Sequence, residues 1–186
     1  DVCDAVDNNC NGVLDDNNSL SFDGYSNYVQ MSDFNIGTSD FTLEAWVYPN
    51  DVQNGYIITN RTVEQSGSGS WFGLKFDQSN LQLEIAGTNP NQYETISGTG
   101  GLILQQWTHV AVVRSGFVYT LYVNGEADGT FTDTNPRDLT TGNNIGRLGG
   151  WVDNNAAWFN GKMDEVRVWN VARTQNEIKQ KKTAYV

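Results

Sequence analysis

The residues with the clearest chemistry form a short acidic segment near the N-terminus, which has the spacing of a calcium-binding loop. Oxygen ligands at alternate positions suit Ca²⁺, and a glycine at position six allows the sharp turn of such a loop. Gly12 holds that position in the run DNNCNGVLDD. The predicted ligands are Asp7, Asn9, Asn11, the carbonyl of Val13, Asp15 and Asp16. Asn18 stands at position twelve instead of a glutamate, so the loop is not a standard EF-hand.

Two cysteines, Cys3 and Cys10, lie in the same segment. A short-range disulfide between them fits an oxidising compartment and would brace the loop. The alternative is a flexible acidic linker that carries a disulfide. Because the chain opens within this cysteine motif, we expect it to be part of a longer secreted or cell-surface polypeptide.

A second group of residues has the chemistry of sugar recognition. Indole faces stack on sugar rings, and Asp and Asn side chains bind hydroxyl groups. The predicted ligand contacts are Trp151, Asp153, Asn154, Asn155 and Trp158. In the alternative, either tryptophan closes an edge of the fold, since large aromatic side chains usually serve burial. Tyr56, Arg61 and Trp71 flank another loop and are weaker candidates.

Composition limits the partners of the chain. Lys and Arg total 11 against 22 Asp and Glu, and the formal net charge is -11, which disfavours binding to nucleic acid. This acidity suits calcium at particular clusters, although solubility alone could explain most of it. No apolar run reaches membrane-spanning length, so we expect no membrane insertion.

The elements that must position these residues are short strands. Residues 1–18 have too few apolar side chains for a core, whereas residues 19–186 show alternating segments separated by turn residues. The predicted strands are 41–48, 71–76, 81–85, 107–114, 117–123, 126–131 and 162–169. In the first of these, Phe41, Leu43, Ala45 and Val47 share one face. Asn124-Gly125 predicts a tight hairpin turn, and Thr174 with Glu177 predicts the start of a short helix.

Five pieces of the sequence occur in an order that resembles the laminin G-like, concanavalin A-like family. They are SFDGYSNYVQM, FTLEAWVYP, WTHVAVVRSGFVYTLYVNGE, NIGRLGG and FNGKMDEVRVWNVART. The resemblance implies an all-β, two-sheet antiparallel jelly-roll sandwich over residues 19–186, with adjacent first and last strands. It also implies that Asp23 and Asp164 lie on neighbouring strands, where one calcium ion could bind both. The alternative is that they cap turns. The segment CDAVDNNCNGVLDD resembles an Asp-rich metal-binding repeat of bacterial surface proteins.

These observations favour a non-catalytic extracellular binding module. Glycosidases of this fold use a Glu-x-Asp-x-Glu run, and none is present; Glu44, Glu84 and Glu94 lie on separate segments. His109, the single histidine, lies in a strand and is expected to be structural. We expect calcium-dependent carbohydrate recognition or adhesion. The alternative is a structural or protein-protein interaction module of a surface adhesin or extracellular filament, whose partner would be an extracellular protein.

Calcium is predicted to raise the melting temperature, because a ligand that binds only the folded state stabilises it by about 2.7 kcal/mol at a hundredfold excess over Kd. Asp7→Ala should abolish a shift that arises from the N-terminal loop, while Asp164→Ala leaves it intact. Equal melting temperatures in calcium and in EDTA would contradict both predicted sites.

Overall fold

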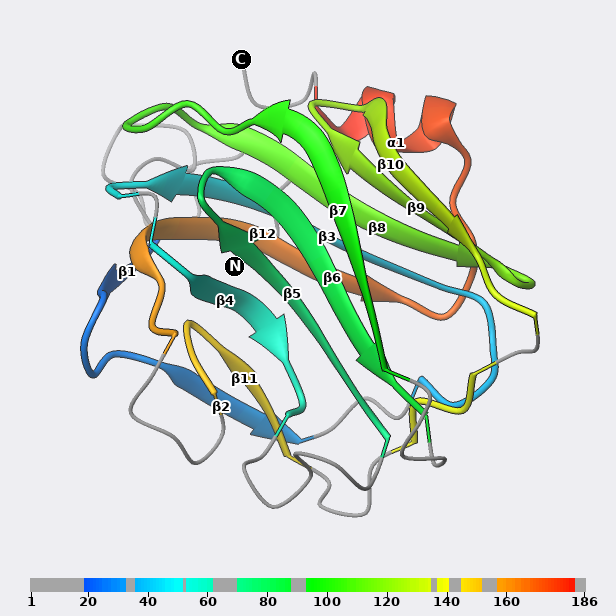
Figure 1. Cartoon of the computed structure of the whole chain (residues 1–186). Helices are drawn as coiled ribbons and strands as arrows, with labels where there is room; N and C mark the ends of the chain where they lie inside the picture. The colour runs from blue at the N-terminus through cyan, green and yellow to red at the C-terminus, as the bar shows by residue number, and fades with distance from the viewer. Residues whose placement is uncertain are drawn as a thin grey trace, which may run out of the picture.

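The computed structural model describes residues 19–32, 36–51, 53–61, 70–87, 93–134, 137–140, 145–151 and 157–182, which form two six-stranded antiparallel sheets and one helix (Figure 1). The first sheet has the order β1 (Leu20–Asp23), β12 (Asn160–Trp169), β3 (Phe41–Pro49), β8 (Thr108–Ser115), β9 (Val118–Val123), β10 (Glu126–Thr132). The second has the order β2 (Val29–Ser32), β11 (Ile145–Leu148), β4 (Gly55–Thr59), β5 (Trp71–Asp77), β6 (Asn80–Ala86), β7 (Tyr93–Gly101). The predicted all-β sandwich is confirmed, and the first and last strands pair.

The core lies between the two sheets and follows from the alternation of side chains along each strand. The predicted inward face of β3 is confirmed, because Phe41, Leu43, Ala45 and Val47 all belong to the core. On β5 the core residues are Phe72, Leu74 and Phe76, so the residues between them face away from the first sheet. The second sheet therefore presents an outer face that is free to carry polar and aromatic side chains.

Two-residue turns set the register of the hairpins. The predicted turn between β9 and β10 is confirmed, with positive φ at Asn124 (52°) and Gly125 (78°). The turn between β5 and β6 has the same backbone character at Gln78 (49°) and Ser79 (72°). Such turns match the right-handed twist of the strands that they join. The β5–β6 hairpin pairs along its whole length, whereas the β9–β10 hairpin has one register shift, between Ala127 and Gly129.

Helix α1 (Gln175–Lys182) covers the outer face of the first sheet, beside β10 in Figure 1. The predicted capping pair is confirmed: the Thr174 amide donates to the Glu177 carboxylate (2.7 Å), and the Glu177 amide donates to the Thr174 hydroxyl (3.3 Å). Ile178 is fully buried against Ala111 and Val113 of β8. No helix in the described part of the chain is long and apolar enough to cross a membrane.

A buried ionic network also covers the outer face of the first sheet. The Glu44 carboxylate on β3 accepts hydrogen bonds from Arg173 Nη1 (2.8 Å) and Trp169 Nε1 (2.9 Å). His109 is fully buried, lies 3.7 Å from Glu44 and packs edge-on against Trp46. These contacts support the predicted structural role of His109.

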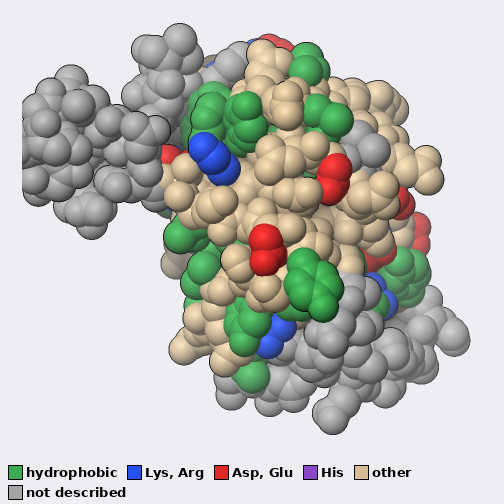
Figure 2. Space-filling model, turned by 90° about the vertical axis from the view of Figure 1, so that its left-hand side faces the viewer, with side chains coloured by type: hydrophobic (Ala, Val, Ile, Leu, Met, Phe, Trp, Pro, Cys, Tyr) green, Lys and Arg blue, Asp and Glu red, His purple; other side chains and the backbone are tan. Residues whose placement is uncertain are grey.

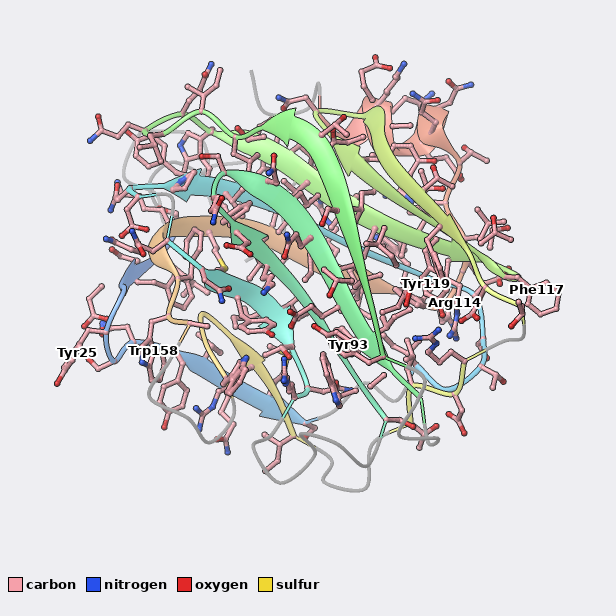
Figure 3. The ribbon with its side chains drawn as sticks, in the orientation of Figure 1. Tyr25, Tyr93, Arg114, Phe117, Tyr119 and Trp158 are labelled. Carbon is pink, nitrogen blue, oxygen red and sulfur yellow. The ribbon has the colours of Figure 1, made fainter. Side chains whose placement is uncertain are left out.

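Arg114 fastens the loops at one end of the sandwich. Its side chain is fully buried beside Tyr119, as Figure 3 shows, and donates to the carbonyls of Gly37, Ser39 and Arg137, each at 2.8 Å. The charge is thus balanced by backbone dipoles. The carbonyls of Ser39 and Arg137 depend on this side chain, whereas that of Gly37 also accepts the Leu139 amide (3.0 Å).

Arg114→Met should lower the free energy of unfolding by at least about 2 kcal/mol, because the carbonyls of Ser39 and Arg137 lose their donor and each such loss costs about 1–3 kcal/mol. Urea denaturation measures this loss. Lys162→Met, at an exposed position of β12, is the matched control and should change stability by less than about 0.5 kcal/mol. Similar stability for both variants would contradict the role of Arg114.

Candidate functional site

The predicted calcium ligands of the N-terminal loop, the disulfide cysteines Cys3 and Cys10, and the ligand residues Asp153, Asn154 and Asn155 lie outside the described residues. Those predictions stay predictions. Within the described ranges, no group of three or more His, Cys, Asp or Glu side chains could hold a metal ion.

Asp23 and Asp164 lie on neighbouring strands as expected, but they do not meet. Asp23 pairs with Asn160, and Asp164 follows four residues later along β12, which is roughly 13 Å at the rise of a strand. Burial raises the pKa of the Asp164 carboxyl, and its Oδ1 accepts the Glu165 amide (2.8 Å). The register is therefore incompatible with one calcium ion shared by these two carboxylates.

Asp23 instead caps the turn that follows β1, which is the alternative that the sequence left open. Its Oδ1 accepts the backbone amides of Tyr25 (2.9 Å), Ser26 (2.8 Å) and Asn27 (3.0 Å), and its Oδ2 accepts the Ser26 hydroxyl (2.9 Å). These hydrogen bonds hold the pKa of the carboxyl well below its usual range. The turn is consequently fixed in one conformation by a single side chain.

This turn presents Tyr25, whose side chain is 80% exposed. Together with Ser26, Tyr28 and Trp158 it lines a pocket of about 220 Å³ at the rim of the sandwich. Tyr28 and Trp158 are stacked, with ring centroids 6.0 Å apart and planes at 29°, and the Arg147 guanidinium lies 3.8 Å from the Tyr28 ring. Figure 3 shows Tyr25 and Trp158 close together at this end. We call these four residues the rim pocket.

Two glycines allow the close packing around the rim pocket. Gly24 has a φ of 73°, and a Cβ there would lie 2.7 Å from the Asn160 side chain. A Cβ on Gly150 would lie 2.4 Å from the Trp158 ring. Glycine has no side chain at either position. The turn after β1 can therefore pack closely on Asn160, and the Trp158 indole can pack closely on Gly150.

The rim pocket has the chemistry of a small polar ligand site. Aromatic rings provide rigid flat surfaces, and the tyrosine and serine hydroxyls provide hydrogen bonds at their edges. Its volume lies below the roughly 300–1,000 Å³ of sites for drug-sized ligands. Figure 2 shows this side of the molecule, where hydrophobic side chains surface as separate patches among polar ones. The arrangement suits a single ring of a larger ligand.

Trp151 does not join Trp158 in the rim pocket. It lies on the outer face of the second sheet, where its ring packs against Tyr56 (6.0 Å) and over the guanidinium of Arg61 (4.4 Å). The Arg61 guanidinium also lies over the Trp71 ring, 4.0 Å from its centre. The structure thus gathers the three weaker sequence candidates around Trp151 and separates the two tryptophans of the predicted ligand loop.

One carboxylate, Glu84 on β6, holds this outer-face cluster together. It lies 3.0 Å from Arg61 Nη1 and 2.8 Å from Lys75 Nζ, and it accepts hydrogen bonds from the hydroxyls of Tyr56 and Tyr93. Burial by itself would raise the pKa of Glu84, but the hydrogen bonds from Lys75 and Tyr56 outweigh it and the pKa is lowered. Burial raises the pKa of Tyr56, and the Glu84 charge raises it further.

Sequence reasoning missed Tyr25 and Tyr28 in the rim pocket, and Lys75, Glu84 and Tyr93 in the outer-face cluster. A signal existed for two of them, because Lys75 and Glu84 stand at the polar positions of strands whose alternate residues are apolar. Their convergence is a product of the pairing of β5 with β6, which no local pattern displays.

The chain belongs to the family described as the concanavalin A-like lectin/glucanases superfamily, whose laminin G-type model matches residues 23–179.

Solved structures share this fold. The CBM40 domain of a Ruminococcus gnavus sialidase, bound to α2,3 sialyllactose, is 14% identical, with a TM-score of 0.75 over 88% of this chain and 96% of that one. Domain 4 of the extracellular arabinanase AbnA from Geobacillus stearothermophilus, in complex with arabinotriose, is 19% identical, with a TM-score of 0.67 over 87% and 75%. A heptameric pentraxin from Limulus polyphemus is 21% identical, with a TM-score of 0.64 over 87% and 79%. At these identities the likeness establishes the fold alone.

Glu84→Gln should lower the free energy of unfolding by about 3 kcal/mol at neutral pH, because it leaves Arg61 and Lys75 buried without a counter-charge. The lowered pKa of Glu84 means that its contribution is complete above the ordinary value of 4.5 and is lost as the pH falls through the lower value of the folded state. The stability difference between the wild type and Glu84→Gln should therefore shrink below pH 4.5 in chemical denaturation.

Glu126→Gln serves as the matched control, since the Glu126 side chain is 71% exposed and pairs with Lys179 at the surface. It should cost less than about 1 kcal/mol. A Glu84→Gln difference that is small, or that stays constant down to pH 2, would contradict the account of the cluster.

Proposed function

We propose that the chain is a non-catalytic extracellular carbohydrate-binding module that holds a glycan at the rim pocket. The observation that carries this proposal is Tyr25, which is 80% exposed yet held by the three amide hydrogen bonds of the Asp23 turn. A binding surface that is rigid before the ligand arrives loses less conformational entropy on binding. An exposed aromatic on a fixed backbone, beside the Tyr28–Trp158 stack, has the form of a sugar platform.

The fold adds support of a general kind. Similar structures bind sialyllactose in one case and arabinotriose in another, so the architecture carries acidic as well as neutral saccharides. Because function resides in the site and not in the fold, the sugar must be selected by the side chains of this chain. A single small pocket predicts weak binding, which tandem copies or a multivalent surface would strengthen.

A specific observation favours a second candidate, adhesion to a protein. Ile103, Leu104 and Trp107 between β7 and β8 are 63%, 41% and 38% exposed, and Trp107 packs on Tyr48. Exposed apolar side chains that gather in one place mark interaction surfaces. Trp46 and Trp71 are buried whereas Trp107, Trp151, Trp158 and Trp169 are not, so the tryptophans do not decide between the two candidates.

Calcium remains part of the proposal through the N-terminal loop. The oxygen-rich spacing of residues 7–16 supports it, and binding there would stabilise the segment that precedes β1. The rim pocket does not depend on that ion, because the Asp23 carboxylate is already engaged by the turn that it caps.

Tyr25→Ala and Trp158→Ala should each weaken glycan binding roughly fivefold, since an aromatic contact contributes about 1 kcal/mol beyond burial. A glycan array identifies the ligands, and titration of the best of them measures the loss. Tyr25→Ala is the sharper variant, because so exposed a side chain contributes little to folding and the melting temperature should not change.

Trp107→Ala is the matched control, as it removes a partly exposed tryptophan from the apolar residues between β7 and β8. Glycan binding that survives both rim variants but fails in Trp107→Ala would contradict the assignment of the site. No bound glycan, together with a protein partner that Trp107→Ala loses, would favour the second candidate.

A further inference from the structure

The outer-face cluster contains an arginine whose guanidinium contacts two indole rings. The Arg61 guanidinium lies 4.0 Å from the centre of the Trp71 ring and 4.4 Å from that of Trp151. A planar guanidinium stacks on aromatic faces in this way, and the stacking leaves only its edges for hydrogen bonds.

One edge of Arg61 is occupied, and the other has no hydrogen-bond partner among the described residues. Nη1 donates to Glu84 (3.0 Å) and to the Tyr56 hydroxyl (3.1 Å). Nε is buried without a hydrogen-bond partner, and none of the hydrogen bonds among the described residues goes to Nη2. The N–H groups of Nε and Nη2 point in parallel from the same edge, which is the fork that matches the two oxygens of a carboxylate. A buried donor without a partner is costly, so this edge favours an incoming acceptor.

The local charge has the sign that a carboxylate needs. Arg61 and Lys75 converge on one acid, Glu84, which leaves an excess of one positive charge in a chain whose net charge is -11. The side chains of Arg61 and Lys75 are only 14% and 7% exposed, so solvent and salt screen them weakly. An overall acidic surface repels polyanions, whereas a single carboxylate can approach such a site.

Aromatic surface lies beside this edge. Tyr93 is 48% exposed, and its ring packs against Trp71 at 5.7 Å. Arg147 connects the cluster with the rim pocket, because it donates to the Trp151 carbonyl and lies over the Tyr28 ring. A saccharide chain that enters the rim pocket therefore has the outer-face cluster as its neighbour.

We propose that the Nε–Nη2 edge of Arg61 binds the carboxylate of an acidic sugar, of the uronic or sialic acid class. The inference rests on the proposed carbohydrate function and names its ligand class. Trp71, Trp151 and Glu84 position the guanidinium, and Tyr93 provides the accessible ring against which the sugar packs.

The first test uses the wild-type chain and needs no substitution. Glucuronic acid and N-acetylneuraminic acid are each titrated beside their methyl esters by ligand-observed NMR. The ester keeps the shape of the sugar and removes its charge, so the acid should bind at least about tenfold more tightly, as expected for hydrogen bonds between charged groups. Equal affinity for acid and ester would overturn the proposal.

The second test separates the two sites. Arg61→Lys keeps the charge but loses the fork, so the preference for acid over ester should disappear in the variant, whose folding is first checked by circular dichroism. For an oligosaccharide that carries the acidic sugar and is long enough to reach both sites, Tyr25→Ala should weaken acid and ester alike and keep their ratio. If neutral glycans bind in a Tyr25-dependent manner and the acid-to-ester ratio of the wild type is one, this inference fails while the proposed function stands. If the ratio is high but Tyr25→Ala changes no binding, the rim pocket fails and the Arg61 site stands.

Discussion

The arrangement of the outer face of the second sheet depends on one carboxylate, Glu84. Two cations, Lys75 and Arg61, are buried there, and a buried charge without a partner would be expelled to solvent or neutralised. Glu84 keeps both in place, and Arg61 in turn orders Trp71 and Trp151 by stacking. The aromatic and basic character of this face is therefore a consequence of a single ion-pair network across two paired strands.

The two faces of the sandwich have different roles. The outer face of the first sheet is closed by α1, by Ile178 against β8, and by the buried Glu44 with Arg173 and Trp169. The second sheet keeps partly accessible aromatic rings on its outer face and continues into the rim pocket. The proposed glycan and carboxylate sites therefore lie on the second sheet and its rim, where Asp23 and Glu84 each fix their neighbours.

Local sequence patterns predicted the features that depend only on residues close together in the chain. The alternation in β3, the Asn124-Gly125 turn and the Thr174–Glu177 cap were all readable, because each depends on neighbours in sequence. Alternation did not predict β1, β2, β4, β7 or β11, and β1 was expected only from the family resemblance. Four of them have only four or five residues, and β7 carries three glycines in a polar run, so the apolar alternation is too short or too weak to recognise.

The site was predictable only in part for the same reason. Trp158 could be proposed because aromatic and amide residues gather around it in sequence. The shared calcium site of Asp23 and Asp164 failed because a family resemblance predicts which strands are neighbours but not the register between them. Arg61 and Glu84 lie 23 residues apart and meet only through the pairing of β4, β5 and β6.

NMR of the tryptophan indole N–H and backbone amide signals tests most directly whether a glycan occupies the rim pocket. The chain is titrated with its best-bound array glycan, and the signals that move are assigned. The account predicts that the Trp158 indole and the amides of Tyr25, Ser26 and Asn27 shift first and saturate together. Shifts confined to Trp107 and Leu104, with the Trp158 signal unmoved, would contradict it.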